Sequence, residues 1–171
     1  MREQAESGSG FSVLDGVALV TGAAVASVHI RGVIRAGLNG FGWALIWGTF
    51  TWVALTAAGP FVFLVRRFAR RLPDYPKVGD GLWAVLGLPW LATAVLKSAA
   101  PGAEESRNET LLAVGLAVAS MIALSVVWRQ WVMVTPEQAS RTASPPWTNR
   151  VGLILSVAWP IQCGLGLLVL G

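Results

Sequence analysis

Charged, thiol and imidazole side chains are scarce in this sequence. Only 13% of its 171 residues are charged, against about 25% in a typical soluble domain. Cys163 is the only cysteine and His29 the only histidine. One thiol cannot form an internal disulfide, and these two residues cannot build a zinc site, an iron–sulfur cluster or a bis-histidine haem. The sequence therefore predicts no cofactor and no metal.

Catalytic and nucleotide-binding motifs are also missing. No Gly-x-Ser-x-Gly nucleophile elbow occurs. The glycine-rich stretch at 37–42 has neither the phosphate-loop spacing nor the dinucleotide-binding spacing. The net charge is +4, but the basic residues gather at the ends of apolar runs, which favours anionic lipid headgroups over nucleic acid as the partner. We therefore predict a protein that is not an enzyme and binds no nucleic acid.

Long apolar runs are the dominant feature that is present. Residues 41–65 carry no ionisable side chain, and a helix of that length rises about 37 Å, enough to cross a hydrocarbon layer of about 30 Å. Comparable runs predict five spans, at about 11–30, 41–65, 82–99, 111–134 and 151–170. The expected fold is an all-α polytopic transmembrane helix bundle, with a disordered tail at 1–10 and one domain at 11–171.

The segment 11–30 is the weakest of these spans. Asp15 and His29 lie near its ends, and small residues dominate its middle, which favours close helix packing in lipid. An alternative is an interfacial N-terminal helix, which would leave four spans. Cleavage as a signal peptide after the sequence Ala-Val-Ala at 24–26 is a further reading. Arg2 is balanced by two nearby glutamates, which argues against cleavage.

The distribution of basic residues predicts the orientation. With five spans, nine of the thirteen Lys and Arg residues fall on the side that holds residues 66–81. Short cytoplasmic loops are enriched in Lys and Arg. We therefore expect a cytoplasmic N-terminus and an external C-terminus.

Four arginines form the sharpest local signal. Arg66, Arg67, Arg70 and Arg71 follow the second span directly. At helical spacing they are expected to share one face and contact anionic headgroups at the cytoplasmic surface, each contributing about 1 kcal/mol.

Polar and kinking residues inside the spans are the remaining candidates. Asp15 and His29 are expected at the interface, although a buried Asp15 paired with another span would indicate function. Pro60, Pro89 and Pro160 each free a backbone carbonyl, which could line a polar pocket walled by aromatic rings or could reflect simple packing. The ring candidates are Trp90 and Trp159, which with Trp52 fall near mid-membrane and are expected at helix–helix contacts.

A resemblance to other proteins indicates in which membrane the protein resides. Residues 59–61 (Gly-Pro-Phe), 73–83 and 88–90 (Leu-Pro-Trp) are similar to the central block of a family of small polytopic bacterial inner-membrane proteins without known activity. The similarity covers about residues 15–100 and implies a multi-pass protein of the bacterial inner membrane. We expect a non-catalytic accessory or scaffold subunit that packs against other membrane proteins or against copies of itself. The alternative is a small transporter or channel that uses the proline-kinked third and fifth spans.

Overall fold

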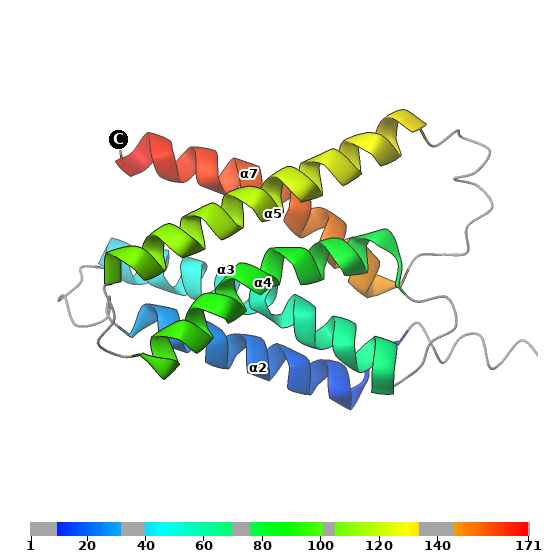
Figure 1. The fold of residues 1–171 in the computed structure, drawn as a ribbon, viewed down its shortest axis with the longest axis horizontal. Helices are drawn as coiled ribbons and strands as arrows, with labels where there is room; N and C mark the ends of the chain where they lie inside the picture. Colours follow the sequence, from blue (N-terminus) through cyan, green and yellow to red (C-terminus); the bar gives the residue numbers. More distant parts are fainter. Residues whose placement is uncertain (1–9, 32–39, 70–75, 101–104, 134–145, 171) are drawn as a thin grey trace, which may run out of the picture.

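The computed structural model describes residues 10–31, 40–69, 76–100, 105–133 and 146–170. Five α-helices make up almost all of this part of the chain (Figure 1). They are α2 (Val13–Ile30), α3 (Gly40–Leu64), α4 (Val78–Ala99), α5 (Glu105–Met133) and α7 (Trp147–Leu170), and a π-helical turn, η2 (Val65–Ala69), extends α3. The expected all-α class is confirmed, and each helix covers one of the expected spans.

Successive helices run in opposite directions (Figure 1). As a result α2, α4 and α7 begin at the same end of the bundle, where α3 and α5 end. We call this the Asp15 end. Four helical segments are long and apolar enough to cross a membrane, at Val13–Ile30, Ile46–Ala69, Val78–Ala99 and Ser106–Arg129. This is consistent with an integral membrane protein.

Glycines bring the helices into backbone contact. A Cβ added to Gly22 of α2 would collide with the backbone of Ala54 and Ala58 in α3. Gly59 of α3 lies against the backbone of Trp83 in α4 in the same way, and Gly87 lies against Pro60. In a lipid environment, which provides no hydrophobic drive between helices, such close van der Waals packing favours their association.

The prolines are accommodated by this packing. Pro60 is buried within α3, where its ring fills the space above Gly87. Pro89 of α4 lies against Gly115 of α5. Pro160 lies within α7 and is half-buried. For Pro60 and Pro89, these contacts agree with the packing interpretation.

Helix α5 is the least enclosed of the four candidate spans. Only 11% of its apolar window is buried, against 33–39% for the other three. In the view of Figure 1 it passes obliquely across α7, and the two helices diverge on either side of this crossing. Its outward side chains are therefore available to lipid or to another protein.

Candidate functional site

A buried ion pair links α2 to the end of α3. The Arg66 guanidinium donates from Nε to Asp15 Oδ1 at 3.1 Å and from Nη2 to Asp15 Oδ2 at 2.9 Å. Both side chains are 0% exposed. Two parallel bonds of this kind are the strongest arrangement open to an arginine and a carboxylate.

The start of α2 places Asp15 for this pair. Ser12 is the N-cap, and its hydroxyl accepts a hydrogen bond from the Asp15 backbone N–H at 3.3 Å. Asp15 Oδ2 in turn accepts from the Ser12 backbone N–H at 2.9 Å. This reciprocal capping box satisfies two otherwise free backbone donors and holds the carboxylate at the first turn of the helix.

The guanidinium of Arg66 is enclosed on its other sides as well. Nη2 also donates to the Gly10 carbonyl at 3.3 Å, and the guanidinium carbon lies 5.2 Å from the centre of the Trp147 ring in α7. The Trp147 ring packs edge-on against Trp83 of α4 at 5.9 Å. Arg66 therefore contacts α2 through charge and α7 through a cation–π interaction.

A second buried carboxylate lies at the Asp15 end. Asp80, in the first turn of α4, is 2% exposed, and its Oδ2 accepts from the Lys77 backbone N–H at 2.9 Å. Thr148 of α7 lies beside Asp80, and Arg66 is near enough to act on Asp80 electrostatically. Asn149 Oδ1 accepts from the Gly79 backbone N–H at 2.8 Å, so α7 supplies a cap to α4. We call these five residues the polar cluster: Asp15, Arg66, Asp80, Thr148 and Asn149.

The structure places two arginines of the predicted basic face in different environments. Arg66 differs from the expected headgroup contact because it is fully buried, whereas its neighbour Arg67 is exposed. Arg70 and Arg71 lie outside the described residues. Adjacent residues on a helix point about 100° apart, so Arg66 continues the buried row of Ala58 and Val62 while Arg67 does not. Asp15 follows the alternative of a buried carboxylate paired with another helix, and it lies in the first turn of α2.

Aromatic rings gather deeper in the bundle. Trp159 stacks on Trp52 at 5.9 Å and meets Trp90 edge-on at 6.3 Å. His29 packs edge-on against Trp90 at 5.2 Å, and its Nε2 lies 3.1 Å from the Trp90 carbonyl oxygen. As expected, the three tryptophans lie at helix–helix contacts. Through this carbonyl His29 contacts α4, and its side chain is half-buried.

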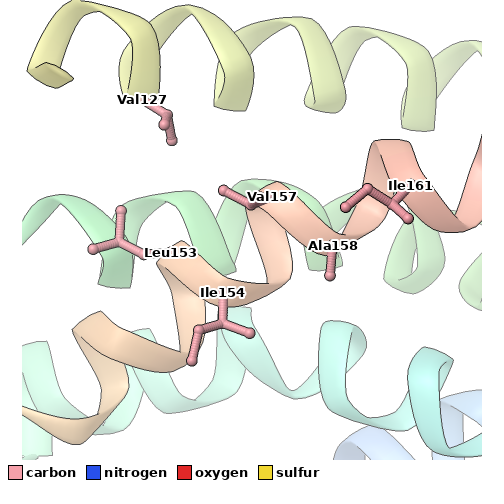
Figure 2. A pocket seen from close by; sticks show the side chains of 6 residues that line it. All are labelled: Val127, Leu153, Ile154, Val157, Ala158 and Ile161. Carbon is pink, nitrogen blue, oxygen red and sulfur yellow. The ribbon is translucent and has the colours of Figure 1, made fainter.

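An open apolar groove separates α5 from α7. Its volume is about 440 Å³. Figure 2 shows that most of its lining comes from successive turns of α7, with one residue from α5 opposite. The lining residues are Val127, Leu153, Ile154, Val157, Ala158 and Ile161. Since all six are apolar, the groove suits an apolar occupant.

Within the described residues, no three His, Cys, Asp or Glu side chains come together in a way that could hold a metal ion. The polar cluster instead joins the beginnings of α2, α4 and α7 to the end of α3. Sequence reasoning raised Asp15 as a candidate but missed Arg66 as its partner, and it did not raise Asp80 as a site residue. Asp80 is the third residue of α4, which begins at Val78.

These observations define an all-helical protein with four membrane-span-capable helices, held together by glycine contacts and one buried charged cluster. Comparisons of the chain with models of protein families, with curated proteins and with solved structures find no match.

Proposed function

We propose that this chain is a five-span protein of the bacterial inner membrane that acts as a non-catalytic accessory or scaffold subunit, packing against other membrane proteins or against a second copy. The observation that carries this proposal is the exposure of α5, of which only 11% of the apolar window is buried. The groove beside it leaves a second apolar surface open. A subunit that binds partners within the bilayer needs such surfaces.

Helix α7 is the proposed fifth span. It has 24 residues, and the 20 from 151 to 170 carry no charge. With five spans the Asp15 end is cytoplasmic, because it holds most of the Lys and Arg residues. Arg67, Lys77 and Arg129 are exposed at that end, where they would meet anionic lipid headgroups.

A tryptophan placed in the groove tests the proposed packing surface. Val157 is 47% exposed and lines the groove, so in Val157→Trp a large ring occupies the space that a partner would take. We expect the wild type, extracted in mild detergent, to run as a complex, and Val157→Trp to weaken that association by roughly tenfold or more. Light scattering coupled to size-exclusion chromatography and native mass spectrometry would measure both.

The matched control is Val17→Trp on α2. Val17 is 55% exposed, and α2 lies at the opposite edge of the bundle from α7 (Figure 1). Its association should equal that of the wild type. A wild-type protein that is a clean monomer in several mild detergents contradicts the proposal, as do two variants that weaken association equally.

A second candidate function is a small transporter, favoured by one observation. Asp15, Arg66 and Asp80 are ionisable and buried within membrane-span-capable segments, and such residues often mark ion pathways. We rank it second because the charges sit at one end, while Trp52, Trp90 and Trp159 pack together deeper in the bundle.

Reconstitution into liposomes tests the transporter. If the protein transports, ion or solute flux should appear with the wild type and fall by at least tenfold in Pro160→Ala, which straightens α7. Unchanged far-ultraviolet circular dichroism would show that the variant remains folded. Absence of wild-type flux for the monovalent ions, protons and small solutes tried would count against this candidate.

A further inference from the structure

Three buried polar atoms of the polar cluster have unused hydrogen-bonding capacity. They are Arg66 Nη1, Asp80 Oδ1 and Thr148 Oγ1, and none has a hydrogen-bond partner in the part of the chain that the structure describes. Arg66 and Thr148 are 0% exposed and Asp80 is 2% exposed. A buried polar group without a partner destabilises a protein, and more so when it is charged.

Contacts of neighbouring residues bring the three side chains to the Asp15 end. The Arg66 guanidinium carbon lies 5.2 Å from the ring centre of Trp147, the residue before Thr148. Gly79, the residue before Asp80, donates its backbone N–H to Asn149, the residue after Thr148, at 2.8 Å. The other polar side-chain atoms of Arg66 and Asp80 already have hydrogen-bond partners. Arg66 Nε and Nη2 bind Asp15, and Asp80 Oδ2 binds the Lys77 backbone. What remains is one nitrogen donor, one carboxylate acceptor and one hydroxyl that can do either.

We propose that this cluster binds one buried water molecule, which bridges Arg66 of η2, Asp80 of α4 and Thr148 of α7. The water accepts a hydrogen bond from Arg66 Nη1 and donates one to Asp80 Oδ1. Its third bond is to the Thr148 hydroxyl. Buried waters typically make about three such bonds to otherwise unsatisfied groups.

The charges of the site select a neutral ligand. A cation at this position would face the Arg66 guanidinium, and an anion would face the Asp80 carboxylate, so either would meet repulsion at close range. Full burial of the lining atoms restricts the ligand to a small one. Water is neutral, small, and both a donor and an acceptor.

The bridge has a structural consequence. The ion pair with Asp15 ties Arg66 to α2, and the water ties the same guanidinium to α4 and α7. The charge on Asp80 is then connected to Arg66 through one molecule, and α2, α3, α4 and α7 share one polar network at the Asp15 end.

A structure of the full-length protein in lipid nanodiscs, at a resolution that shows ordered water (about 2 Å), tests the site directly. We expect one solvent peak within roughly 2.7–3.2 Å of all three atoms. A direct bond between Arg66 Nη1 and Asp80 Oδ1, or no solvent peak between them, would overturn the proposal.

Two substitutions at Thr148 give an independent measurement. Thr148→Ser keeps the hydroxyl, and Thr148→Val keeps the shape but removes it. We expect Thr148→Val to lower the melting temperature of the detergent-solubilised protein by roughly 2–10 °C relative to Thr148→Ser. Equal melting temperatures for the two variants would show that the hydroxyl binds nothing and would overturn the bridge.

Discussion

Arg66→Ala is expected to destabilise the protein by about 3–5 kcal/mol, because it leaves the Asp15 carboxylate buried without a countercharge. Asp15 is 0% exposed and receives two hydrogen bonds from Arg66. Because Asp15 is buried, bulk water does not solvate the orphaned charge, and the carboxylate must either stay uncompensated or take up a proton at a cost in free energy. Thermal unfolding of the detergent-solubilised protein, followed by the fluorescence of its nine tryptophans, should show the loss.

Two further variants separate the ion pair from a general effect of losing an arginine. Arg129 is exposed at the end of α5, so Arg129→Ala should leave the melting temperature within about 2 °C of the wild type. The double variant Asp15→Leu with Arg66→Met removes both charges and should recover much of the stability lost in Arg66→Ala, as observed when buried pairs are replaced by apolar residues. If Arg66→Ala and Arg129→Ala melt alike, the buried pair is not formed in the membrane.

Hydropathy alone predicted the helices. Each expected span lies on one observed helix, and α3, Gly40–Leu64, differs from the expected 41–65 by one residue at each end. The larger errors are at the starts of α4, α5 and α7, which begin four, six and four residues before the expected 82, 111 and 151. Those extra turns are polar, and apolar length carries no information about how far a helix continues beyond the hydrocarbon.

The polar cluster was harder to predict. Arg66 and Asp15 are 51 residues apart, and no local spacing relates them. The four arginines at 66, 67, 70 and 71 suggested a single basic face, but adjacent residues of a helix point in different directions, and Arg66 is buried while Arg67 is exposed. Arg66 is buried because it lies in register with Ala58 and Val62 on the buried side of α3. A search for basic residues in register with an apolar row would have found it.

Close packing by the small residues of α2 was predicted, but the residues that they contact were not. The glycine and alanine content of α2 indicated close packing, and Gly22 does meet the backbone of α3 at Ala54 and Ala58. Gly79 of α4 also meets Gly152 of α7. This contact was missed because the two glycines are far apart in the sequence and no local motif relates them. Only the crossing of α4 and α7 brings them together.

Gly79→Ala is the second substitution with a large expected effect. A Cβ on Gly79 would collide with the backbone of Asn149, and a Cβ on Gly152 would collide with the Gly79 carbonyl. Backbone cannot move aside as a flexible side chain can, so the two helices must separate. Overpacking of this kind typically costs about 1–3 kcal/mol, and we expect Gly79→Ala to reach the upper part of that range.

Gly81→Ala, two residues along the same helix, is the control. Nothing lies within 4 Å of a Cβ added there, so this variant should be neutral or more stable by up to about 1 kcal/mol, because alanine favours helix over glycine. Separation of α4 from α7 should also break the bond from the Gly79 backbone N–H to Asn149 Oδ1, which is 2.8 Å long, and draw Thr148 away from Asp80. Hydrogen exchange at the first turn of α4 should therefore rise in Gly79→Ala and stay unchanged in Gly81→Ala. Equal exchange and equal melting temperatures in the two variants would mean that α4 and α7 do not meet at these glycines.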